Sequence, residues 1–195
     1  MVGNRPLKGA PKLSKRVEEL FYREIVRQCD HALFATAEVD QAIANPHLGA
    51  PSRLWFGLEC LLIAGANISK LLFGVSQAHA NARKSFRAKL GVTDDSPFFY
   101  ERLKMRNVFE HFDEQLIDWC LQHNKGESIV DTSLGDPSRT FASDKTQPTA
   151  FLRIYDPATC ILTYRGIACD MRALANAVGV LREVALSKVE GATHG

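Results

Sequence analysis

Motifs that would assign a chemistry at once are scarce in this sequence. It contains no Gly-rich phosphate loop, no CxxC pair and no nucleophile-elbow pattern around a serine. The five cysteines are Cys29, Cys60, Cys120, Cys160 and Cys169. Their odd number and wide spacing argue against a zinc site and against a disulfide framework. We therefore expect no metal, no cofactor and a reducing compartment.

Net charge and long apolar runs are also limited. The formal net charge is only +2, which by itself does not indicate nucleic-acid binding. Basic residues gather in segments 1–16 and 83–106, which we interpret as a solvated tail and a solvated helix face. The most apolar run, Leu54 to Ala66, contains Glu59 and is too short and too polar to span a bilayer. Since no secretory signal is visible either, we predict a cytoplasmic protein with no membrane partner.

The chain length of 195 residues suits one domain, and its 46% apolar content is ordinary for a globular protein. Segment 1–12 holds two prolines and two glycines without periodicity, so we expect a flexible arm. A single helical domain should follow over 13–190, and 191–195 should be a frayed tail. Segment 126–149 is rich in Ser, Thr, Asp, Pro and Gly, which predicts a long exposed loop within that domain.

Apolar residues recur every three to four positions over most of the chain, which is the period of an amphipathic helix. Two short β-branched and aromatic runs, 151–155 and 161–165, surround an Asp156-Pro157 turn and predict a hairpin. The expected fold is therefore mainly α, a bundle of four to five helices with one small β-hairpin at 151–165. The expected helices are 14–45 with Ser14 as N-cap, 53–73 capped by Ser52, 76–90, 96–124 starting at Ser96-Pro97, and a last helix capped by Asp170.

The helix expected at 96–124 separates into two faces on a wheel of about 100° per residue. Arg106, Asn107, Glu110 and His111 fall together in one polar patch. Leu103 and Ile117 border this patch, which suggests that it faces another protein surface. The opposite, core-facing arc contains Met105, Val108, Phe109, Phe112, Leu116 and Trp119.

The polar patch has the groups that RNA cleavage by its own 2′-hydroxyl needs. His111 can transfer a proton near neutral pH, and the planar guanidinium of Arg106 suits phosphate oxygens. Asn107 offers a neutral donor and acceptor, and Glu110 can orient either cation. The wheel alone favours a simpler interpretation, in which Arg106 and Glu110 are an i, i+4 pair on a solvated helix face.

The run Arg106-Asn107-x-x-x-His111 resembles the R-x4-6-H signature of the HEPN superfamily. The phrase RNVFEHFDEQLIDW, from Arg106 to Trp119, is similar to the version found in uncharacterised bacterial HEPN-like proteins. The similarity covers roughly residues 14–124 and the last helix. The loop at 126–149 and the hairpin are not part of the usual HEPN core.

This resemblance implies a metal-independent endoribonuclease, such as a toxin or defence effector, or else a non-catalytic scaffold or a nucleotide- or RNA-binding interaction module. It implies a homodimer whose motif helices build one cleft, RNA as substrate and a nucleotidyltransferase as antitoxin. By the same resemblance, Arg106 would stabilise the phosphate, His111 would move the proton and Asn107 would hold the ribose or phosphate. These three residues are the candidate catalytic set, with Glu110 in support.

Two further observations concern residues away from the motif. Glu59 lies inside an apolar helix and needs a partner, because an unpaired buried carboxylate is costly. We weigh equally that it meets Arg106 and that it faces a groove. The remaining histidines have no ligand-like spacing and are interpreted as surface residues; they are His31, His47, His79, His123 and His194.

Overall fold

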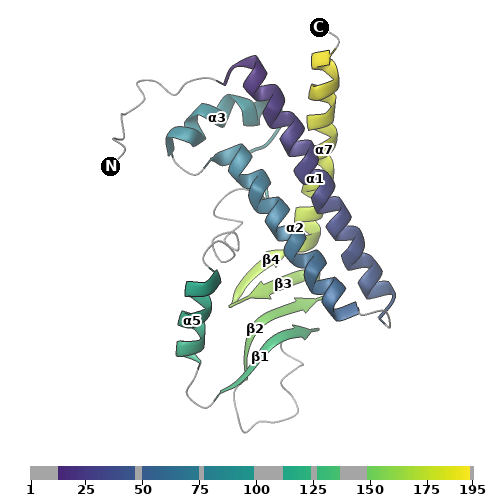
Figure 1. Ribbon diagram of the computed structural model, residues 1–195, viewed down its shortest axis with the longest axis vertical. Coiled ribbons are helices and arrows are strands. Elements are labelled where there is room, and N and C mark those ends of the chain that lie inside the picture. Colours follow the sequence, from purple (N-terminus) through teal and green to yellow (C-terminus); the bar gives the residue numbers. More distant parts are fainter. Residues whose placement is uncertain are drawn as a thin grey trace.

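The computed structural model describes residues 13–46, 50–74, 77–98, 112–123, 127–136 and 149–193. Three long helices run side by side along its length, and a small sheet with one further helix lies toward one end (Figure 1). The mainly α fold is confirmed, while the β part is larger than the single hairpin that we predicted. The helices are α1 (Lys15–Ala44), α2 (Ala50–Phe73), α3 (Gln77–Lys89), α5 (Phe112–Gln122) and α7 (Met171–Thr193).

Local capping sets several helix limits where the sequence predicts them. The Ser14 hydroxyl accepts a hydrogen bond from the Val17 N–H at the start of α1. The Asp170 carboxylate does the same for the Ala173 N–H at the start of α7. Gly74 and Gly91 follow α2 and α3 in the left-handed conformation, with φ of 71° and 67°, which a glycine adopts without strain.

Three predicted helix limits are wrong. Helix α2 begins at Ala50 rather than after a Ser52 cap, because Pro51 is tolerated in a first turn whose N–H groups need no intrahelical partner. Ser96 to Phe98 lie in a bend and a turn rather than in a helix, and the Ser96 hydroxyl accepts a hydrogen bond from the Phe98 N–H. Helix α7 continues to Thr193, beyond the start of the predicted frayed tail.

Helix α1 packs against both α2 and α7, and the buried residues of α2 lie on more than one of its faces. The Gly57 Cα approaches α1 so closely that a Cβ would lie 2.9 Å from the Ala35 carbonyl oxygen. Leu58, Ile68 and Leu72 are fully buried, and each such side chain contributes about 1.5–3 kcal/mol on leaving water. Among the described helices, α2 alone is long and apolar enough to cross a membrane, judged by length and composition only. The shorter run Leu54 to Ala66 had suggested that it is not. In the protein, 56% of the apolar window of α2 is buried.

The sheet has four strands in the order β1-β2-β3-β4. The predicted hairpin is confirmed as β2 and β3, which pair in antiparallel fashion, and β4 adds a second antiparallel partner. These strands supply core residues such as Leu152, Leu162 and Tyr164. The strands are β1 (Ser128–Leu134), β2 (Thr149–Asp156), β3 (Ile161–Tyr164) and β4 (Ile167–Asp170).

Strand β1 corrects the prediction of a loop over 126–149. It pairs in parallel with β2, with Val130 opposite Phe151. Ile129, Val130 and Thr132 are β-branched residues that suit a strand, although Ser and Asp surround them. Its largely exposed side chains fit a strand at the edge of the sheet.

Candidate functional site

All four residues of the predicted polar patch lie outside the described residues. Arg106, Asn107, Glu110 and His111 all fall in segment 99–111. Helix α5 begins directly after this segment, so the exposure of its side chains bears on the core face and the patch border of the predicted wheel. Trp119 is 5% exposed and Ile117 is 61% exposed, as the predicted core face and patch border require.

Glu59, the remaining predicted site residue, forms an ion pair with Arg153 of β2. The Arg153 Nε also lies 3.1 Å from the Asp131 Oδ1, and its guanidinium carbon lies 5.8 Å from the centroid of the Tyr164 ring. Burial raises the pKa of Tyr164, while the neighbouring Arg153 charge opposes that rise. Glu59 thus has a partner within the described residues, and this cluster joins α2 to the sheet.

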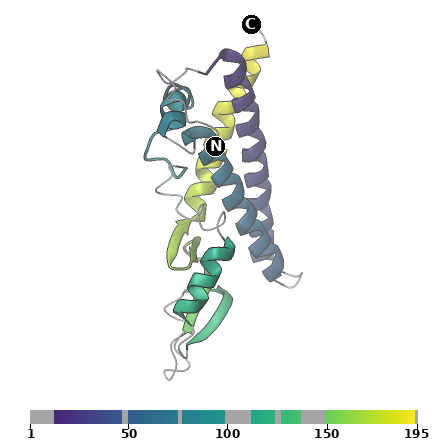
Figure 2. The same ribbon diagram turned by 60° about the vertical axis from the view of Figure 1, so that its left-hand side comes forward.

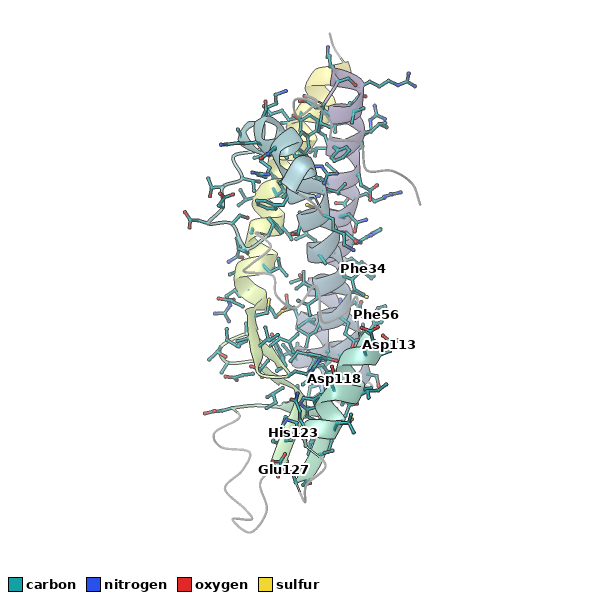
Figure 3. The ribbon with its side chains drawn as sticks, turned by 90° about the vertical axis from the view of Figure 1, so that its left-hand side faces the viewer. Phe34, Phe56, Asp113, Asp118, His123 and Glu127 are labelled. Carbon is teal, nitrogen blue, oxygen red and sulfur yellow. The ribbon has the colours of Figure 1, made fainter. Side chains whose placement is uncertain are left out.

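A different set of side chains gathers where α5 ends. The His123 N–H donates to the Trp119 carbonyl oxygen at 3.2 Å, which places His123 one turn below Trp119. The two rings lie 4.9 Å apart between centroids at 47°. The His123 Nδ1 lies 2.5 Å from the Glu127 Oε2, and Figure 3 shows the pair at the lower end of α5. His123 is therefore a half-buried, oriented imidazole rather than the surface residue that we expected.

A cavity of about 300 Å³ opens beside this pair. Arg165 reaches it from the turn between β3 and β4, where Arg165 and Gly166 have φ of 50° and 79°. Consecutive left-handed residues suit a two-residue hairpin turn, and the Arg165 N–H bonds to the Leu152 carbonyl oxygen at 2.8 Å. The cavity is lined by Trp119, Gln122, His123, Ala150, Phe151, Arg165 and Gly166.

These lining groups combine a proton-transferring ring, a permanent cation and an aromatic surface. Glu127 engages one ring nitrogen of His123, which leaves the other for a ligand. Arg165 can bind an anion such as a phosphate, and the Phe151 ring can pack against a flat group. Among the described residues no cluster of three or more His, Cys, Asp or Glu could hold a metal ion.

Sequence reasoning missed this site because its parts are far apart in the chain. The only local signal was the spacing of Trp119, His123 and Glu127, which repeats every four residues. Arg165 lies on a β-turn that the sequence predicts as the end of a strand, and nothing in its neighbours indicates contact with α5. No protein family, no curated protein and no solved structure matches this chain.

Proposed function

We propose that this protein is a HEPN-like, metal-independent endoribonuclease. The observation that carries the proposal is the Arg106, Asn107 and His111 set, spaced to share one face of a helix. The phase of α5 supports it, since Trp119 is buried and Ile117 exposed as that wheel requires. The mainly α fold is compatible with the same proposal.

In this mechanism the substrate supplies its own nucleophile. His111 removes the proton from a ribose 2′-hydroxyl or delivers one to the leaving 5′-oxygen. Arg106 stabilises the negative charge that develops on the pentavalent phosphorus, and Asn107 positions the ribose or phosphate. The 2′-oxygen forms a bond to phosphorus as the bond to the 5′-oxygen breaks, which leaves a 2′,3′-cyclic phosphate and a 5′-hydroxyl.

The active species in this proposal is a homodimer in which two copies of the motif build one cleft. Ile117 and Leu121 are each 61% exposed on α5, and apolar side chains of that size in solvent fit an interface. A toxin or defence role, with a nucleotidyltransferase as antitoxin, belongs to the same proposal. The competing function is a non-catalytic scaffold or RNA-binding module on the same dimer.

The test is cleavage of structured and single-stranded RNAs in the presence of excess EDTA. Wild-type protein should cut, and His111→Ala and Arg106→Ala should each lose roughly a hundredfold or more of the rate. His31→Ala is the matched control, because His31 is exposed on α1. Cyclic phosphate ends should appear on the products. Intact RNA at high enzyme concentration would favour the scaffold, and loss of fold in His111→Ala would make that residue structural.

A further inference from the structure

An apolar groove of about 350 Å³ lies between α1 and α2. The two helices run side by side in opposite directions (Figure 2). Phe34 of α1 and Phe56 and Ile63 of α2 line this groove and are 68%, 62% and 50% exposed. Figure 3 shows Phe34 and Phe56 on the same side of the two helices. Three large apolar side chains in one open groove indicate a surface that another protein covers.

We propose that this groove binds the same groove of a second copy of the chain, with the two α1 helices antiparallel. The two copies are then related by a two-fold axis that crosses the helices. Such a contact requires a surface that is complementary to itself. The proposed contact is separate from the α5 dimer and goes beyond the function proposed above.

The face of α1 that borders the groove has this self-complementarity. Arg27, His31, Phe34 and Glu38 follow one another at steps of four, three and four residues, which keeps them on one face of the helix. His31 and Phe34 line the groove itself. When a second α1 lies antiparallel with its Phe34 opposite His31, its Glu38 lies opposite Arg27, because each lies four residues outside the central pair. The second copy therefore places opposite charges together at both ends of the contact.

The two charged residues also have partners within their own chain, and those pairs are compatible with a second copy. Arg27 pairs with Glu24, and the Arg53 Nη2 lies 2.7 Å from the Glu38 Oε2. Each end of the groove thus carries one charge of each sign, so a second copy meets no excess of like charge. The Arg27 side chain remains 65% exposed in its pair, and its guanidinium has more N–H donors than one carboxylate engages.

The apolar area sets the strength of this contact. Covering a whole aromatic side chain removes about 150–250 Å² from water, so the three exposed apolar residues offer roughly 300–400 Å² per copy. A stable dimer buries about 800 Å² per partner. The Asn67 amide donates to the Gln28 Oε1 at 3.2 Å, so covering these two polar lining residues leaves that bond intact. The groove contact is therefore weak and forms at high protein concentration, whereas the α5 dimer persists in dilute solution.

Sedimentation equilibrium of the Ile117→Glu protein measures this contact apart from the α5 dimer. Between micromolar and millimolar concentration, this protein should pass from monomer to dimer. Adding Phe34→Glu should weaken the association roughly tenfold or more, because it would bury a charge in an apolar contact. Adding Val180→Glu is the matched control and should change nothing, since Val180 is exposed to a similar extent but lies on α7.

A charge exchange in the same background identifies the occupant and its direction. Arg27→Glu and Glu38→Arg each place like charges opposite one another in the antiparallel pair, so each variant alone should associate roughly tenfold more weakly or worse. An equimolar mixture of the two variants restores opposite charges at both ends and should recover most of the affinity. Effects within each chain are the same alone and in the mixture, so they cannot produce this recovery.

Three outcomes would overturn the proposal. They are a monomer up to millimolar concentration, equal losses in Phe34→Glu and Val180→Glu, and a mixture that associates no more tightly than either charge variant alone. The last would indicate a parallel contact or a partner other than a second copy. The result is independent of RNA cleavage, so a protein that associates through the groove but cuts no RNA refutes the endoribonuclease alone.

Discussion

Glu59 of α2 and Arg153 of β2 form an ion pair although 94 positions separate them in the chain. The Arg153 side chain is 18% exposed, so much of its charge is shielded from water. Asp131 of β1 approaches the same guanidinium from a more exposed position. The carboxylate inside the most apolar helix thus serves to fasten the sheet to the helical bundle.

Glu59→Gln should lower the free energy of unfolding by about 1–3 kcal/mol, because a shielded Arg153 would lose its principal counter-charge. Asp131→Asn is the matched control and should cost no more than about 1 kcal/mol, as expected for an exposed partner. Urea denaturation of both variants measures the difference. Equal losses would show that Glu59 contributes no more than a surface charge.

Gly57→Ala should destabilise the contact between α1 and α2. An added Cβ would lie 2.7 Å from the Val39 Cγ2 and 2.9 Å from the Ala35 carbonyl oxygen, and the latter is backbone that cannot turn aside. We expect a loss of about 1–3 kcal/mol, seen as a lower Tm.

Gly179→Ala is the control for this substitution. Gly179 lies in α7, and a Cβ built there meets nothing within 4 Å. Alanine should then stabilise the helix by about 0.5–1 kcal/mol, because glycine loses more backbone freedom on folding. If both variants shifted Tm in the same direction, close packing at Gly57 would not be the cause.

Stability should fall in alkaline solution because of two buried thiols. Burial raises the pKa of Cys29 to about 12 and that of Cys169 to about 11, and neighbouring aspartates add to each rise. An unfolded thiol ionises near pH 8.5, so above that pH the unfolded state loses its proton while the folded state keeps it. The contribution of each thiol is complete below about pH 8.5 and is lost as the pH rises toward the folded pKa, by about 1.4 kcal/mol per pH unit.

Urea denaturation at pH 7 and pH 10 measures this loss, and the variants Cys29→Ala and Cys169→Ala identify its source. Each substitution should reduce the difference between the two pH values, whatever it does to stability at pH 7. A difference that neither variant alters would assign the alkaline loss to other groups.

Light scattering should give the mass of a dimer, with α5 in the interface. Ile117→Glu should weaken that dimer, because it would place a charge on an apolar surface that the second copy covers. Val180→Glu is the control, since Val180 is at least as exposed as Ile117 but lies on α7. A monomer at high concentration, or equal weakening by both variants, would contradict an interface on α5.

Features of the fold that depend on neighbours in the chain could be predicted. The caps at Ser14 and Asp170 and the stop at Gly91 are interactions within a few residues, so their residue types are sufficient. The same holds for the opposite exposures of Trp119 and Ile117, which follow from the helical period alone.

Only the tertiary structure decided which distant segments meet. Strand β1 exists because β2 offers a free parallel edge, and Ser128–Leu134 without that partner reads as a polar loop. Likewise, folding of the sheet against α2 and α5 brings Glu59 into an ion pair with Arg153. It also places His123 and Arg165 in the lining of the same cavity. By itself the sequence determined a mainly α chain, since its apolar pattern is periodic, and the polar face of Arg106 to His111 stays a prediction from the same period. The cavity beside His123 could not be predicted from the sequence, because its lining residues are far apart in the chain and no local pattern indicates contacts over such separations.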